Sequence, residues 1–336
     1  MNNLPVGLDE CEVVEALRAS WGLNTDAVTY VQVGFGSHHW DARLADGRRY
    51  FLTADDLDQK PWIGADRKVA FEGLRSAFDT ALALYEQAHL DFVVPPIRTN
   101  DGDSVRRITP QYTLAVFPFM AGRSGHFGEQ ISGEERVELL RLLADLHQAT
   151  PIVRSTAPRR GIGLPERPVL EAALNDLDQP WEGGPFAEPA RKQLATYAEV
   201  ALQWLESFDR LAEEVATSGH EQVITHGEPH GGNLIRAGGR LLLIDWDTVA
   251  LAPPERDLWM LDSGYAKSLM QYAKATNRQV NQSAIALYRL VWMLSDIANF
   301  LSVFRSNHQR TEDTQLAWRA FTDYLRLEEP PPGSSE

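Results

Sequence analysis

The stretch that decides the fold is Ile224-Thr-His-Gly-Glu-Pro-His-Gly-Gly-Asn-Leu-Ile235, followed by Leu241-Leu-Leu-Ile-Asp-Trp-Asp247. Its skeleton is Glu228, four residues, Asn233, a Gly-Gly turn, a short apolar strand and Asp245. Phosphoryl transfer needs a carboxylate that orients the attacking hydroxyl, an Asn that binds a metal ion, and an Asp that bridges metal and phosphates. The order and spacing of Glu228, Asn233 and Asp245 match these three parts and predict a catalytic loop followed by a metal-binding strand end.

Three runs inside residues 221–262, "HGEPHGGN", "LIDWD" and "LAPPERDLW", carry a family resemblance. The chain resembles aminoglycoside phosphotransferases of the protein-kinase-like superfamily, in motif most of all the spectinomycin-phosphotransferase branch and related antibiotic kinases. The resemblance implies ATP or GTP and Mg²⁺ as cofactors. It also implies an α+β, two-lobe kinase-like fold: a small mixed lobe with an antiparallel sheet (1–117), a hinge (118–122) and a larger, mainly helical lobe (123–327). The Pro-rich tail 328–336 is predicted to be disordered.

The amino-acid composition limits the kinds of partner that the protein can bind. The formal charge of -15 argues against nucleic acid, which needs a basic face, and is compatible with a cationic substrate. The single cysteine, Cys11, excludes an internal disulfide and is predicted to be a packed core thiol in a helix over 8–20. We find no apolar run near ~18 residues and no signal pattern, so we expect no membrane contact and a cytoplasmic monomer or dimer.

The N-terminal third reads as the nucleotide-binding lobe. Alternating patterns predict strands over 28–32, 40–44 and 49–53, and helical spacing predicts a long helix over 66–90. The turn that carries Gly34, Gly36 and Ser37 would let backbone N–H groups approach phosphates, although a Gly-x-Gly is often only a hairpin turn.

Thr53 marks a departure from the family, because the resemblance places a lysine at this strand position. Lys60 and Lys68 are the lysines between that strand and the long helix, and either is a candidate for the phosphates. Arg48, Arg49 and Arg67 are further substitutes. Glu72 on the long helix is the candidate partner for such a cation, or else a solvated surface residue.

Two more strands, over 104–108 and 112–117, lead into the hinge. Pro118 has no N–H, so Phe119 or a neighbour would supply the backbone donor for the nucleobase. Phe117 and Phe119 are candidates to flank the base, with packing in the core as the alternative.

The rest of the chain predicts helices over 132–147, 169–178, 186–217, 281–306 and 311–326. His147 is predicted to be structural, and His226 to support the catalytic loop. Asp257 resembles the family Asp that braces the loop from below. Asp247 is either a further metal ligand or a turn-stabilising residue, and Trp246 is expected to pack.

Glu228 is the second departure, because most family members have Asp. The extra methylene moves the carboxylate by roughly 1–1.5 Å, a misplacement that can cost ~10²-fold. Pro229 restricts Glu228 to extended conformations, so the loop can be built around the longer side chain.

These observations leave three hypotheses for function. The first is a kinase that transfers the γ-phosphoryl of ATP or GTP to a hydroxyl of a sugar-containing, aminoglycoside-like antibiotic. The second is a kinase of a housekeeping metabolite, such as choline, a hydroxy amino acid or a sugar. The third is a nucleotide-binding pseudokinase, and the departures from the family pattern at Thr53 and Glu228 support it. Candidate acceptor contacts are Asp262, Asp296 and Glu312.

Overall fold

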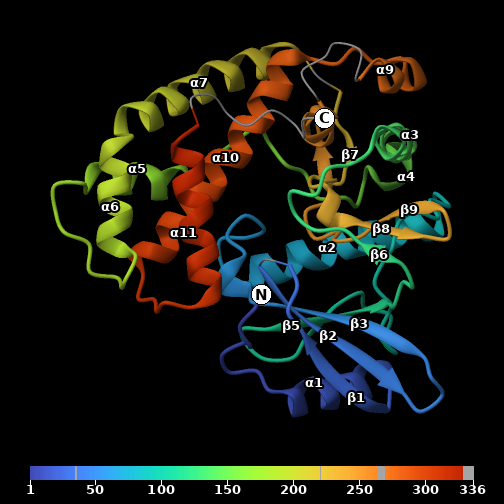
Figure 1. Ribbon diagram of the computed structural model, residues 1–336. Coiled ribbons are helices and arrows are strands. Elements are labelled where there is room, and N and C mark those ends of the chain that lie inside the picture. The colour runs from blue at the N-terminus through green and yellow to red at the C-terminus, as the bar shows by residue number, and fades with distance from the viewer. Residues whose placement is uncertain (35, 220, 263–268, 328–336) are drawn as a thin grey trace.

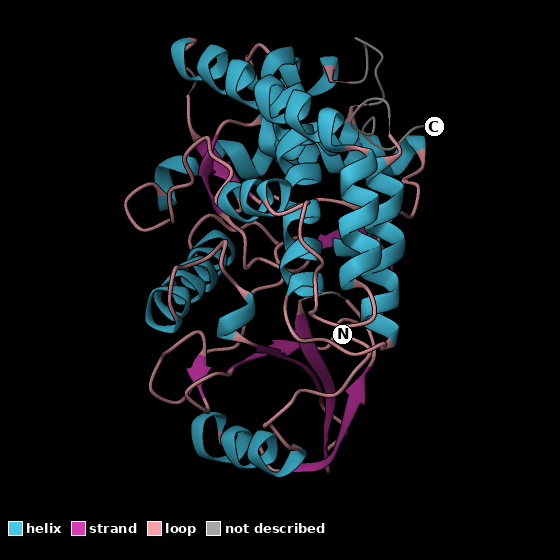
Figure 2. Ribbon diagram, turned by 90° about the vertical axis from the view of Figure 1, so that its left-hand side faces the viewer, coloured by secondary structure: helices cyan, strands magenta, loops and turns pink. Residues whose placement is uncertain are grey.

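The computed structural model describes residues 1–34, 36–219, 221–262 and 269–327. The tail expected to be disordered lies outside these residues. A five-stranded antiparallel sheet in the order β1-β2-β3-β5-β4 occupies one end of the molecule, and helices make up most of the other (Figures 1 and 2). The strands are β1 (Thr25–Val31), β2 (Ser37–Leu44), β3 (Arg49–Asp55), β4 (Arg106–Arg107) and β5 (Thr113–Pro118).

The outer face of this sheet packs on helix α1 (Glu10–Ala16) and the π-helical turn Leu17–Trp21 that continues it. Val13, Leu17 and Trp21 are buried against Trp40 and Leu52 of the sheet. Cys11 is exposed, so its predicted place in the core was wrong. Of the predicted apolar stripe Leu8, Cys11, Val14 and Leu17, Leu8 and Leu17 are buried, whereas Cys11 and Val14 are exposed and Val13 is buried instead.

Helix α2 (Arg67–Glu86) packs on the inner face of the sheet and on the helical part of the molecule. Leu74 and Phe78 contact Ala115 and Phe117 of β5, whereas Ala77, Ala81 and Leu84 join the core beneath the catalytic hairpin. The predicted helix is confirmed, and it couples the sheet to the site.

The helical part contains two apolar cores. One joins α3 (Gly133–Gln148), the short α4 (Thr150–Val153), α8 (Glu255–Leu258) and α9 (Met270–Thr276) to the catalytic hairpin. The other joins α5 (Arg167–Asn175), α6 (Ala187–Thr196), α7 (Ala198–Thr217), α10 (Gln282–Arg305) and α11 (Glu312–Leu325). The predicted helix over 186–217 is broken at Tyr197, and α4 and α9 were not predicted.

Two small sheets position the predicted catalytic loop and the strand that follows it, residues 224–235 and 241–247. Strands β7 (Val223–Thr225) and β10 (Ala250–Ala252) pair, and β6 (Arg123–Ser124), β8 (Leu234–Ala237) and β9 (Arg240–Leu243) form the second sheet. The hairpin β8–β9 pairs Leu234 with Leu243, which brings Asn233 next to the end of β9. The predicted hinge at 118–122 begins at the last residue of β5 and ends just before β6.

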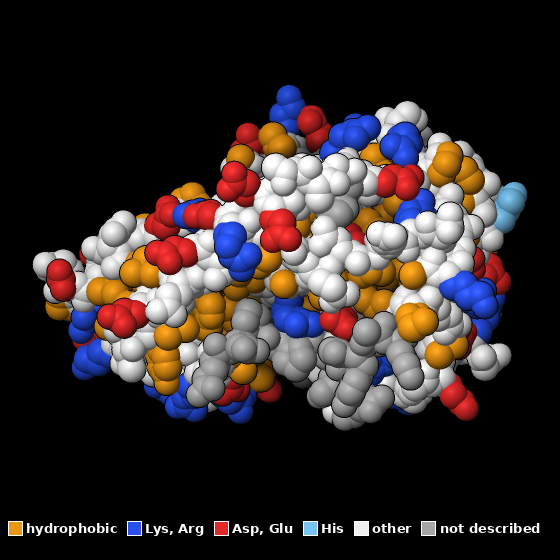
Figure 3. Space-filling view, turned by 90° about the horizontal axis from the view of Figure 1, so that it is seen from above, with side chains coloured by type: hydrophobic (Ala, Val, Ile, Leu, Met, Phe, Trp, Pro, Cys, Tyr) orange, Lys and Arg blue, Asp and Glu red, His pale blue; other side chains and the backbone are white. Residues whose placement is uncertain are grey.

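Helix α10 is long and apolar enough to cross a membrane by length and composition, but 61% of its most apolar window is buried inside the fold. It packs against α5, α7 and α11 and is the central helix of the second core. On the face seen from above, basic and acidic side chains are interspersed and do not gather into a basic patch (Figure 3).

Candidate active site

The catalytic loop leaves β7 at His226, whose ring has a defined tautomer. The Glu228 N–H donates to His226 Nδ1 at 3.2 Å, so His226 Nε2 carries the proton and donates to the Ile244 carbonyl at 2.9 Å. The ring also packs edge-on against buried Trp246, at 4.6 Å between centroids. His226 therefore ties the loop to the end of β9 through the backbone, which confirms its predicted supporting role.

Asp257 of α8 holds the loop from below and is fully buried. Its two carboxylate oxygens accept the N–H groups of His226 (2.9 Å) and Gly227 (2.6 Å). His147 Nε2 lies 3.0 Å from the same carboxylate, and His147 Nδ1 lies 2.7 Å from the Tyr272 hydroxyl. Burial disfavours the charge of Asp257, but the bond from His147 and the charges of His147 and Arg256 outweigh it and lower the pKa of Asp257. The bracing role is confirmed.

Gly227 fits its place only because it has no side chain. Its φ is 103°, and a Cβ would lie 2.3 Å from Nη2 of Arg256, which is buried and donates to Thr225 Oγ1 and the Thr248 carbonyl. Gly227→Ala should therefore lower the free energy of unfolding by about 2–4 kcal/mol, the sum of backbone strain and overpacking. In Gly238→Ala, at φ 59° with open space around it, the cost should be only about 1 kcal/mol. Urea unfolding of both variants measures the difference, and equal losses would contradict the role of Arg256.

Glu228 has a fixed backbone and a free side chain. Its carbonyl accepts the N–H of His230 (2.8 Å) and Nδ2 of Asn233 (2.9 Å). Its carboxylate makes no hydrogen bond to another residue within the described ranges and is half-buried. Burial, reinforced by the charges of Asp247 and Asp296 and opposed by those of Arg256 and Lys60, raises the pKa of Glu228 to about 7. A carboxyl group with such a pKa suits a general base near neutral pH.

Asn233 and Asp245 have the donor oxygens that a Mg²⁺ ion prefers. Because Asn233 Nδ2 is bound to the Glu228 carbonyl, its Oδ1 is left as an acceptor, and the Ile244 N–H bound to the Asn233 carbonyl (3.1 Å) places Asp245 beside it. Asp245 adopts φ 66°, in the left-handed region where Asp is tolerated, at the end of β9. Its side chain is exposed, yet desolvation by the surrounding protein atoms, and then the charges of Asp247 and Glu228, raise the pKa of Asp245 well above its usual value.

This repulsion between carboxylates is what a bound cation relieves, so the two residues fit the implied metal. No group of three His, Cys, Asp or Glu side chains with metal-binding geometry occurs among the described residues. Mg²⁺ commonly uses one or two protein oxygens and takes the others from nucleotide phosphates and water.

Asp247 forms an ion pair with Lys60, a residue that follows strand β3 of the five-stranded sheet. Lys60 Nζ lies 2.7 Å from Asp247 Oδ2 and 2.8 Å from Asp55 Oδ1, and both lysine and Asp55 are buried. Burial lowers the pKa of Lys60, but the charges of Asp247, Asp55 and Asp245 outweigh it and the net shift is upward. Sequence reasoning missed Asp55, whose only signal was a carboxylate two residues after the Thr53 position.

The other candidate cations lie outside the site. Arg67 pairs with Asp58, Arg48 with Asp46, and Arg49 with Asp41. Lys68 and Glu72 are exposed on α2, so Glu72 is not the partner of the lysine in the site. Thr53 Oγ1 bonds His39 Nδ1 at 3.2 Å and stays on the sheet.

The glycine turn and the hinge can also be located. Gly34 and Gly36 have φ values of 70° and 87°, and Ser37 follows them with its Oγ 3.1 Å from Lys60 Nζ. Phe117 packs edge-on against Phe78 at 5.7 Å. The Phe119 N–H points at the Arg49 carbonyl (3.4 Å) and continues the β3–β5 ladder, so this N–H is already bonded within the sheet.

Of the three candidate acceptor contacts, Asp296 on α10 is close enough to Glu228 for its charge to raise the pKa of Glu228. Its Oδ2 accepts from the Tyr324 hydroxyl at 2.9 Å. Burial, opposed by that bond and reinforced by Glu166, raises the pKa of Asp296 to about 7. Asp262 is buried and pairs with Arg289 at 3.5 Å, and Glu312 is exposed at the start of α11.

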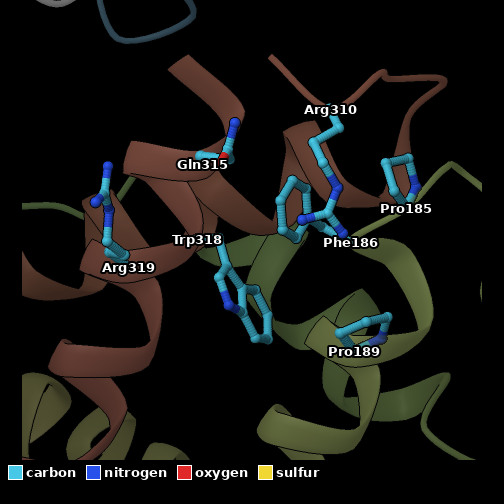
Figure 4. A pocket seen from close by; sticks show the side chains of 7 residues that line it. All are labelled: Pro185, Phe186, Pro189, Arg310, Gln315, Trp318 and Arg319. Carbon is cyan, nitrogen blue, oxygen red and sulfur yellow. The ribbon is translucent and has the colours of Figure 1, made fainter. Parts of the chain in front are cut away.

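His230, for which the sequence suggested no role, caps the turn Gly231–Asn233 by accepting the Gly232 N–H at 3.1 Å. A separate hollow of about 330 Å³ lies between α6 and α11 (Figure 4). The Arg310 guanidinium covers the Phe186 ring there at 4.7 Å, and the lining has no carboxylate. It offers none of the chemistry of the loop described above.

The chain is similar in sequence and in fold to known proteins. The chain is 26% identical to protein StrN of Streptomyces griseus over 316 residues, which cover 89% of this chain and 92% of that protein. The crystal structure of spectinomycin phosphotransferase with ADP and spectinomycin is similar at a TM-score of 0.72 and 15% identity, covering 95% of each chain. An amicoumacin kinase bound to AMP-PNP and Ca²⁺ is similar at a TM-score of 0.57 and 13% identity, covering 97% of this chain and 96% of that one.

The structural likeness confirms the predicted two-lobe, protein-kinase-like fold. Residues 42–289 match the model of the phosphotransferase enzyme family, a span that includes Glu228, Asn233 and Asp245 and ends before Asp296. Because this match covers well over half of the 336 residues, the chain belongs to the phosphotransferase enzyme family.

Proposed function

We propose that the protein transfers the γ-phosphoryl group of ATP or GTP to a hydroxyl of a small, sugar-containing acceptor, most closely an aminoglycoside-like or other antibiotic. The observation that carries this proposal is the juxtaposition of the Glu228 carboxylate, Asn233 Oδ1 and Asp245 by one loop and one hairpin. The antibiotic kinases among the structural neighbours support the acceptor class.

In the reaction, the acceptor oxygen forms a bond to the γ-phosphorus as the bond to the nucleotide's bridging oxygen breaks, and the hydroxyl proton passes to Glu228. Glu228 orients the hydroxyl, because its backbone is fixed by three hydrogen bonds while its side chain reaches into the cleft. Asn233 and Asp245 would hold Mg²⁺, which neutralises charge on the phosphates when bound. Asp247 forms an ion pair with Lys60. We therefore assign it to that lysine and not to a further metal ion, which was the role considered from the sequence.

Asp296 is the best-placed residue for a cationic group of the acceptor. No salt bridge links Asp296 or its neighbour Glu166 to a Lys or Arg of the described chain, so a ligand amine would offset two crowded carboxylates. Asp296→Asn should raise the KM for an amine-bearing acceptor about 10-fold or more, with little change in nucleotide Kd.

The control is Asp323→Asn, which makes the same change on the neighbouring helix α11. Steady-state kinetics with the acceptor varied, alongside nucleotide titration, separate the two effects. An unchanged acceptor KM in Asp296→Asn would remove it from the acceptor site.

The proposal as a whole is tested by a transfer assay with labelled ATP and GTP against a panel of aminocyclitols, aminoglycosides, choline, hydroxy amino acids and sugars. Phosphorylation of an antibiotic in preference to the metabolites is the expected result. Preference for a metabolite would favour the second hypothesis.

A further inference from the structure

The ammonium group of Lys60 contacts three side-chain oxygens. Its Nζ lies 3.1 Å from Ser37 Oγ, 2.8 Å from Asp55 Oδ1 and 2.7 Å from Asp247 Oδ2. The ammonium donates hydrogen bonds to Ser37 Oγ and Asp247 Oδ2, and it forms a salt bridge with Asp55 Oδ1. The group therefore lies between the end of the glycine turn and the hairpin that ends in Asp245 and Asp247.

Strand β3 explains why a lysine from outside the strand can occupy this place. Ser37 pairs with Asp55 and His39 pairs with Thr53 across β2 and β3, so these side chains share one face of the sheet. A lysine at 53 would emerge from this face, but the chain has Thr53, bonded to His39. Two residues further along β3, Asp55 forms a salt bridge with Lys60, which follows the turn Leu57–Gln59.

We propose that Lys60 is the phosphate-binding cation of this enzyme and that Asp55 is its positioning residue, a pair that takes over from the strand lysine and helix glutamate. This inference rests on the proposed function. Asp247 accepts a hydrogen bond from the ammonium, and a phosphate oxygen takes its place when nucleotide binds.

Burial and hydrogen bonding indicate which carboxylate, that of Asp55 or that of Asp247, gives up its contact with Lys60 when a phosphate binds. The Asp55 side chain is 1% exposed and its Oδ1 also accepts from Ser37 Oγ at 2.7 Å, whereas the Asp247 side chain is 11% exposed. Asp55 Oδ2 is buried without a partner among the described residues, so this carboxylate retains capacity to hold the ammonium. Asp55 is therefore the permanent partner and Asp247 the exchangeable one.

The test measures nucleotide binding by calorimetry in EDTA, so that no metal contributes, with adenosine, guanosine, ADP and GDP as ligands. Lys60→Met should weaken binding of the preferred diphosphate about 10- to 100-fold, the range for a charge-assisted bond, and leave the nucleoside unchanged. The matched control is Lys68→Met, an exposed lysine eight residues on, which should behave as wild type.

Removal of Lys60 leaves two carboxylates unpaired, so single carboxylate variants provide a second line of evidence that keeps the lysine. Asp55→Asn should weaken diphosphate binding, whereas Asp247→Asn should bind it at least as tightly as wild type because the lysine is released. If Asp55→Asn and Lys60→Met lowered stability but changed diphosphate and nucleoside affinity equally, Lys60 would be only a structural tether between the lobes and the inference would be overturned. Failure of the wild type to bind any of the four ligands would instead overturn the proposed function, and this inference with it.

Discussion

Replacing Asp245 by asparagine should abolish phosphoryl transfer and leave the nucleotide-free protein at least as stable as wild type. Asn retains the shape and is tolerated in the left-handed region at φ 66°. It removes the negative charge that would bind Mg²⁺, so the loss in kcat should exceed ~10³-fold, the upper range for removal of a transition-state electrostatic contact.

The stability part of this prediction follows from the raised pKa of Asp245. An acid whose pKa is higher in the folded state than in the unfolded state loses stability as pH rises through that interval, because ionisation is easier when unfolded. At neutral pH the carboxylate is therefore a cost that Asn removes, and the melting temperature should stay the same or rise. Asp209→Asn, an exposed carboxylate on α7, is the control that should keep full turnover. Normal turnover in Asp245→Asn would mean that the metal site is elsewhere.

Glu228→Gln should lower kcat by at least ~10²-fold, the lower range for a positioned acid–base group. Gln keeps the length and can donate but cannot accept the hydroxyl proton. Since the carbonyl and N–H of Glu228 are bound by His226, His230 and Asn233, the substitution should leave the loop in place and nucleotide affinity unchanged.

Glu228→Asp should also lower kcat, because the loop is fixed for the longer side chain. Steady-state transfer to an identified acceptor, with nucleotide Kd measured separately, distinguishes lost chemistry from lost binding. A Glu228→Gln enzyme with the wild-type kcat would show that another group takes the proton.

The catalytic hairpin could be predicted from the sequence because its information is local. The spacing from Glu228 to Asp245 fixes a loop, a turn and a strand, and the pairing of Leu234 with Leu243 follows from the Gly238-Gly239 turn between them. Helices α2, α3, α10 and α11 were predicted for a similar reason, since their apolar residues recur at helical spacing over many turns.

What the sequence could not supply are contacts between distant segments. Lys60 and Asp247 are 187 residues apart in the sequence. No periodic pattern in the sequence predicts that a lysine in a loop contacts an aspartate so far along the chain. Asp257 and His147 are 110 residues apart, so their hydrogen bond is equally invisible. The stripe of α1 was predicted only in part for the same reason: Leu8 and Leu17 are buried, but Val13 and not Val14 lies in the core with Trp40 of the sheet.

The two departures that suggested a pseudokinase acquire a different meaning in three dimensions. Lys60 reaches the place left open by Thr53, and the Glu228 backbone is held on both sides by the loop. The held position of Glu228 favours a working enzyme, whereas a phosphate-binding lysine would serve an enzyme and a nucleotide-binding module alike.

The most direct test of this account is transfer of the labelled γ-phosphoryl group of ATP or GTP to the acceptor panel by the wild-type protein, with Asp245→Asn in parallel. The proposed function predicts a labelled phosphate ester on at least one hydroxyl acceptor in the presence of Mg²⁺, and none with Asp245→Asn. Tight nucleotide binding by the wild type without transfer to any acceptor would contradict it.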